Sequence, residues 1–130
     1  MCHPSMLMLL VALASQVPAP CLHAAAAARE ATAGWGEYRR GAIVQAATHF
    51  AVADSLCPGD HATQVGLGFV RLRQGQPAAA AERFLGAVAS DTSDAEAWYG
   101  LGLAHSRQGQ RASAADAWRR TLRQIGRAHV

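Results

Sequence analysis

The sequence has 130 residues, of which 51% are hydrophobic and 6% aromatic, a composition that fits one modest globular domain. Twelve basic residues, all of them arginine, stand against nine acidic ones, so the formal net charge is only +3. Beyond the pairs Arg39-Arg40 and Arg119-Arg120 the arginines do not cluster, which argues against a nucleic-acid-binding surface. Much of the hydrophobic fraction is alanine, the residue with the highest helix propensity, and the composition therefore predicts an all-α domain.

The first 26 residues are predicted to form a leader. Met6–Ala14 is an apolar run far shorter than the about 20 residues that span a bilayer, so no stable membrane span is expected. Its length is typical of a signal-peptide core, and the alanines at 24–28 offer A-x-A cleavage sites, which predicts export to the periplasm. Because residues 1–5 contain no Lys or Arg, a cytoplasmic protein with an uncleaved leader is the alternative.

The three cysteines are Cys2, Cys21 and Cys57. Cleavage within 24–28 would remove the first two, so Cys57 is expected to remain alone, with no internal disulfide. It is then expected to act as a small apolar side chain at the end of a helix.

From residue 27 onward the sequence repeats with a period of 34 residues, which predicts repeats at 27–60, 61–94 and 95–124. The columns that return at this offset are Gly34, Gly68 and Gly102; Gly41, Gly75 and Gly109; Ala46, Ala80 and Ala114; Phe50, Phe84 and Trp118; Ala53 and Ala87. The arginines Arg39, Arg73 and Arg107 recur at the same spacing.

Each column has a physical reason. A glycine inside a helix costs about 1 kcal/mol relative to alanine, so Gly34 and its equivalents mark places where two helices approach closely. Gly41 and its equivalents suit the left-handed residue that ends a helix, and Pro77 suits the first turn of the next. The aromatic column lies one helical turn after the alanine column and is expected to fill the core. Pro58 ends the first repeat, and Asp60 and Asp94 are expected to cap the helices that follow them. These positions predict six helices near 27–40, 43–56, 61–74, 77–90, 95–108 and 111–124.

The third repeat reads Trp98-x-x-Leu101-Gly102-x-x-His105, followed by Gly109, Ala114 and Trp118, and the second contains Leu67-Gly68, Gly75, Ala80, Phe84 and Ala87. This pattern resembles the signature of the tetratricopeptide repeat (TPR) family over residues 27–124. Arg71 and His105 stand where that family prefers tyrosine, and Gln64 replaces the leading tryptophan. The resemblance implies antiparallel helical hairpins stacked into a right-handed superhelix, and a scaffold or adaptor that binds a peptide or a partner protein.

The resemblance also implies that the first helix of each hairpin lines the concave face. Three columns would face it: Trp35, Phe69 and Leu103; Ala31, Val65 and Tyr99; Tyr38, Leu72 and Ser106. With Arg39, Arg73 and Arg107 beside them, they would form an apolar strip and an arginine ladder suited to an acidic peptide, because guanidinium groups pair with carboxylates. The alternative is that the strip packs a neighbouring helix and the arginines are solvated. Family members that grip chaperone tails use a clamp of lysine, asparagine and arginine, and at those places this chain has Ala31, Trp35, Gly66, Glu96 and Gly100.

No catalytic, metal-binding or cofactor-binding motif is found in the sequence, and His49, His61 and His105 show no metal-ligand spacing. A non-enzymatic binding module is therefore expected. Residues 125–130, which follow Gln124, can be encoded by a stretch that matches a widely used sequencing-library adapter, so we interpret them as non-native and expect the natural chain to continue. The protein would then be a fragment, and two other functions stay open: a regulatory segment of a longer enzyme, or a module that self-associates through its uncapped last repeat.

Overall fold

A computed structural model of the chain describes residues 20–128, and the expected leader core at Met6–Ala14 lies outside them. This part of the chain consists of six α-helices: α2 (Ala24–Arg39), α3 (Ile43–Leu56), α4 (His61–Arg73), α5 (Pro77–Ser90), α6 (Ala95–Arg107) and α7 (Arg111–Ala128). All six helices lie where the sequence predicts them. The first begins three residues earlier than expected, and the last runs through Ala128 rather than ending near Gln124.

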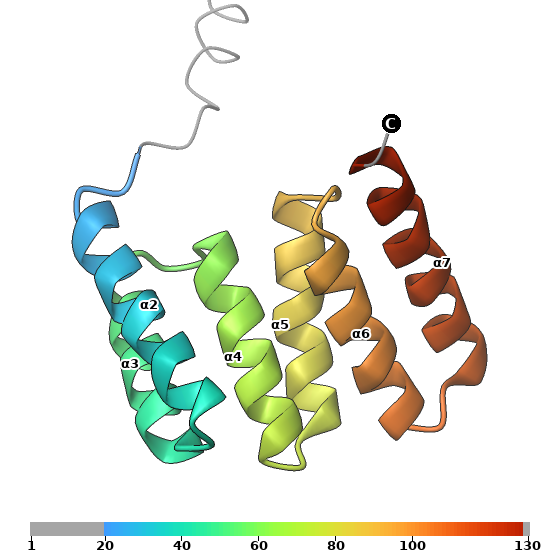
Figure 1. Cartoon of the computed structure of the whole chain (residues 1–130), viewed down its shortest axis with the longest axis horizontal. Helices are drawn as coiled ribbons and strands as arrows, with labels where there is room; N and C mark the ends of the chain where they lie inside the picture. The colour runs from blue at the N-terminus through green and yellow to red at the C-terminus, as the bar shows by residue number, and fades with distance from the viewer. Residues whose placement is uncertain (1–19, 129–130) are drawn as a thin grey trace, which may run out of the picture.

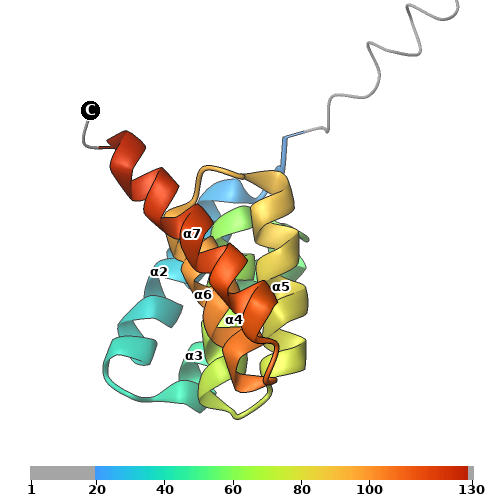
Figure 2. The ribbon, with the colours of Figure 1, turned by 90° about the vertical axis from the view of Figure 1, so that its right-hand side faces the viewer.

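The helices pair as the antiparallel hairpins α2–α3, α4–α5 and α6–α7, which stand side by side along the molecule (Figure 1). The first helices contact one another, α2 with α4 and α4 with α6, whereas α3, α5 and α7 make no contact among themselves. Viewed from the end of the array, the two layers of helices are seen edge on (Figure 2). The close spacing of the first helices makes their layer the inner, concave one.

The same turn ends the first helix of every hairpin. Gly41, Gly75 and Gly109 have φ values of 80°, 72° and 74°, the left-handed region that glycine adopts without steric cost. In the first turn, the Gly41 N–H donates to the Tyr38 carbonyl (3.0 Å), and the Ala42 N–H donates to the Glu37 carbonyl (3.0 Å). This is the Schellman arrangement, and it satisfies the carbonyl groups at the helix end.

Side-chain caps begin two of the next helices. Asp60 accepts a hydrogen bond from the Thr63 N–H (3.2 Å) at the start of α4. Asp94 accepts from the Glu96 N–H (2.8 Å) and the Ala97 N–H (3.3 Å) at the start of α6. The capping role expected for these two aspartates is confirmed.

The core is built by rings that lie against glycines. Phe50 and Phe84 are fully buried, and a Cβ placed at Gly34 or Gly68 would come within 3.0 Å or less of the ring in its own hairpin. The alanines around them are also buried: Ala46, Ala53, Ala80, Ala87 and Ala114. Trp118 differs from the two phenylalanines, since it lies against Gly102 but keeps 37% of its surface exposed.

The expectation of an unpaired Cys57 is wrong. Cys21 and Cys57 form a disulfide, with their Cα atoms 5.8 Å apart, and Cys57 is buried at the end of α3. The residues before α2 are thereby joined covalently to the end of the first hairpin. The prediction failed because it assigned Cys21 to a segment that is removed, whereas the fold brings it beside Cys57.

Candidate functional site

The aromatic column of the inner layer lies mostly inside the molecule. Phe69 is 9% exposed, and its ring centroid lies 6.0 Å from that of Trp35 and 5.0 Å from that of Phe84. Trp35 and Leu103 are partly buried, and Trp35 also makes an edge contact with Phe50 at 5.3 Å. These rings join successive hairpins, so only their outer edges can contact a ligand.

The other two columns are split in the same way. Val65 and Leu72 are 4% and 3% exposed, and Ala31 is buried as well. Tyr38 is half-buried beside Trp35, whereas Tyr99 is 47% exposed. Of the ten residues predicted to bind a partner, Tyr99 is therefore the apolar side chain most open to solvent.

The arginine column connects neighbouring hairpins. The Arg73 guanidinium lies 5.4 Å from the centre of the Tyr38 ring, a cation–π distance. Arg107 donates a hydrogen bond to the Leu72 carbonyl (2.7 Å) at the end of α4. Each contact thus reaches back to the preceding hairpin, while Arg39, which has no preceding hairpin, is exposed.

A cavity of about 290 Å³ opens at the N-terminal end of the inner layer, between α2 and the start of α4. Its wall is built from small side chains around one large ring: Ala24, Ala27, Ala28, Ala31, Thr32, Trp35, Asp60 and Ala62. The sequence analysis included Ala31 and Trp35 in the surface but missed the cavity. The signal was present in the alanine run at the start of α2, because alanines on a helix face leave space that larger residues would fill.

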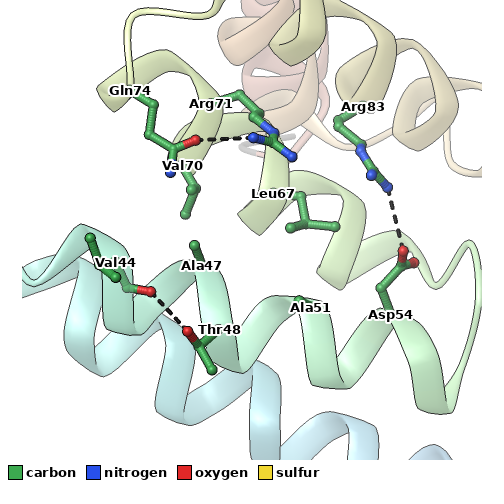
Figure 3. Close-up of a pocket in the computed structure, with 10 residues that line it drawn as sticks. All are labelled: Val44, Ala47, Thr48, Ala51, Asp54, Leu67, Val70, Arg71, Gln74 and Arg83. Atoms are coloured by element: carbon green, nitrogen blue, oxygen red, sulfur yellow. Dashed lines mark hydrogen bonds and ion pairs between the residues drawn. The ribbon is translucent and has the colours of Figure 1, made fainter.

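A second hollow, of about 410 Å³, lies on the outer layer, where α3 and α5 leave a gap above α4 (Figure 3). Its apolar floor includes Leu67 and Val70, and Arg71 and Arg83 stand at its edge. The Arg83 guanidinium pairs with Asp54 (3.5 Å) and donates to the Gln64 side-chain carbonyl (3.1 Å). No column of the sequence analysis pointed to this groove.

His61 links three elements at the start of α4. Its Nε2 lies 2.6 Å from Asp94 Oδ2, and its Nδ1 lies 3.0 Å from the Ala87 carbonyl. Partial burial and the neighbouring Asp94 carboxylate raise the pKa of Glu96 above its ordinary value. Within residues 20–128, no three His, Cys, Asp or Glu side chains gather in a way that could hold a metal ion.

The comparisons identify the fold. The TPR domain of Sgt2 from Aspergillus fumigatus superposes with a TM-score of 0.76 at 22% identity, covering 83% of this chain and 73% of that one. The second TPR of Spaghetti (RPAP3), bound to the HSP90 peptide SRMEEVD, superposes with a TM-score of 0.70 at 18% identity, covering 74% and 89%. No family profile and no curated protein matches the sequence.

The chain therefore has the tetratricopeptide-repeat fold, with three helical hairpins in series. None of the helices in the described part of the chain is both long and apolar enough to cross a membrane.

At the family's clamp positions the structure leaves little for a carboxylate. Ala31 is buried, and Gly66 and Gly100 lie under the rings of Phe50 and Phe84, where even a Cβ would overlap them. Glu96 is acidic and exposed. The inner layer thus lacks the charges with which the clamp holds an acidic tail at these places.

Proposed function

We propose that this chain is an adaptor module that binds an extended peptide of a partner protein across its inner layer. The observation that carries the proposal is the alanine-lined cavity beside Trp35, which is open, apolar and shaped by side chains that leave room for another. Peptide binding by a chain of this fold is supported by the second TPR of Spaghetti, whose structure contains a bound peptide.

The position of the cavity suggests how the peptide lies. The cavity opens at the N-terminal end of α2, and Arg39 ends the same helix, with Arg73 and Arg107 at the equivalent ends of α4 and α6. From Ala28 to Arg39 the helix rises roughly 16 Å, a length that about five extended residues span. We therefore infer a ligand with an aliphatic side chain in the cavity and a carboxylate about five residues away, near the exposed Arg39.

Peptide selection with the full chain tests this arrangement. A displayed random-peptide library should yield sequences that share one aliphatic residue and one Asp or Glu at that spacing. Ala28→Trp should abolish their binding because the new ring fills the cavity from its exposed rim. Ala25→Trp, on an exposed residue of α2 that does not line the cavity, is the matched control.

Arg39→Ala should weaken the same peptides, with Arg40→Ala as its control, because Arg40 already pairs with Glu37. Selected peptides that bind Ala28→Trp as tightly as the unchanged chain would exclude the cavity as the site. This pair of single variants is cleaner than replacing the whole arginine column, because Arg73 and Arg107 also join hairpins.

We also propose that the chain works in an oxidising compartment, which for an exported bacterial protein is the periplasm. Disulfides persist in such compartments and are rare in reducing cytosol. Cleavage among residues 24–28 would remove Cys21, so a processed chain that keeps the disulfide must be cut before Cys21. Mass spectrometry of the chain after secretion tests this: a mature N-terminus within 24–28 would contradict it.

A further inference from the structure

Each buried aromatic residue of a second helix is held between two glycines. Phe50 lies against Gly34 of its own hairpin and Gly66 of the next, and a Cβ on either glycine would crowd the ring. Phe84 repeats the arrangement with Gly68 and Gly100. The residue that lies 16 positions after each ring is therefore a glycine, because the next helix packs directly on the ring.

Trp118 has only the first half of this arrangement. It lies against Gly102 of its own hairpin, and no further helix covers its other side in residues 20–128. The equivalent stripes on α5 and α7 show the effect. Under α6, Ala81, Phe84 and Val88 are 7%, 0% and 5% exposed, whereas on α7 Trp118 and Leu122 are 37% and 69% exposed.

The charges beside this stripe have one sign. Arg119, Arg120 and Arg123 are exposed on α7, and Asp116 is the acid that pairs with the first two, at 3.9 Å and 3.4 Å. An acidic partner would complement this face, and a basic one would be repelled.

A second copy of the chain fits the face poorly. The helix that would continue the array is α2 of the second copy, and in α2 the position equivalent to Gly66 and Gly100 is Thr32. Its Cβ would fall where the packing of Phe50 and Phe84 allows none. Pairing α7 with another α7 would oppose two arginine-rich helices and place Trp118 against a residue other than glycine.

We propose that the stripe Ala115, Trp118 and Leu122 on α7 is a docking site for an acidic amphipathic helix of another polypeptide, which presents a glycine to Trp118. The helix binds as α6 binds α5, with its glycine over the ring and its carboxylates toward Arg119 and Arg123. The site lies on the end of the array (Figure 1), so it is separate from the inner-layer cavity and does not depend on it.

The chain itself supplies a suitable probe. A synthetic peptide of residues 91–107 contains α6 with its cap and its Gly100, and carries three acidic residues against one arginine. Added to the ¹⁵N-labelled full chain, it should shift the indole N–H signal of Trp118, which a Trp118→Phe variant assigns. NMR detects complexes with a Kd of about 1 mM, a binding free energy near −4 kcal/mol.

The matched control is the same peptide with Gly100→Thr. Threonine has a higher helix propensity than glycine, so weaker binding of this peptide could not come from lost helicity. We expect at least about a tenfold weaker Kd, equal to 1.4 kcal/mol. Equal binding of the two peptides, or no shift at millimolar concentration, would overturn the proposal. Sedimentation that shows the chain dimerising by itself, with dimerisation lost in Leu122→Glu, would assign the face to a second copy instead.

Discussion

Replacing Gly66 with alanine tests the ring-on-glycine packing that sets the spacing of the hairpins. A Cβ at Gly66 would overlap the Phe50 ring, which is fully buried and has Gly34 on its other side. Gly36 is the control, because it also lies inside a helix but a Cβ there would meet nothing within 4 Å. Alanine gains about 1 kcal/mol of helix propensity at either position, so the two variants differ only in the steric term.

That term has the magnitude of overpacking, about 1–3 kcal/mol, because the ring has no space into which it can move. Gly36→Ala is expected to raise the free energy of unfolding by up to about 1 kcal/mol, and Gly66→Ala to leave it 1–3 kcal/mol below that variant. Urea unfolding followed by circular dichroism measures both. If Gly66→Ala stabilises the chain as much as Gly36→Ala, hairpin spacing does not depend on this contact. Adding Phe50→Leu should recover part of the loss, since it removes the crowded ring.

Three other predictions concern single contacts. Reducing the Cys21–Cys57 disulfide, which closes a loop of 36 residues, should lower the free energy of unfolding by about 3–4 kcal/mol in a urea titration with and without reductant; unchanged stability would show that the bond does not constrain the unfolded chain. Gln64→Ala should cost about 1–2 kcal/mol in thermal unfolding because it leaves the Arg83 guanidinium without one of its acceptors, and a neutral result would contradict this. Asp94→Asn keeps an acceptor for the α6 cap but removes the charge facing His61, so it should cost less than Asp94→Ala, for which about 1–2 kcal/mol is expected; equal losses would show that capping is not the main role of Asp94.

The fold could be predicted because its steric requirements recur in the sequence. Gly68 and Phe84 must be paired wherever a second helix packs closely on its own first helix, so the pair returns every 34 residues and remains visible without an alignment. The left-handed turn at Gly75 imposes a similar requirement. Such constraints are local to one hairpin, and a single chain with three hairpins displays them three times.

The surface was harder to predict because exposure depends on the neighbouring hairpin. Phe69 belongs to a column that would face a ligand, yet the rings of Trp35 and Phe84 cover it. Arg107 looks solvated in the sequence, and only the stacked hairpins bring the Leu72 carbonyl within its reach. The disulfide of Cys21 failed to be predicted for the same reason, since its partner is brought near by tertiary packing.

The two junctions between hairpins differ in chemistry at equivalent positions. The junction of the first and second hairpins holds the polar group Asp54, Gln64 and Arg83, whereas the next junction holds Val88, Trp98 and Ala117. In a repeat array, stability is approximately the sum of repeat and junction terms. A polar group with one longer ion pair contributes less than buried apolar side chains, so the first hairpin is the part expected to separate at lowest cost.

Two features act on that weaker junction. The disulfide restricts the first hairpin and the residues before it, and the inner-layer cavity is walled by α2 on one side and the start of α4 on the other. A peptide in the cavity would therefore contact both hairpins and favour the docked state by its binding free energy. By the same linkage, any change that loosens the first hairpin lowers the apparent peptide affinity by the fraction that remains docked. Reduction of the disulfide should thus weaken peptide binding without altering any residue of the cavity.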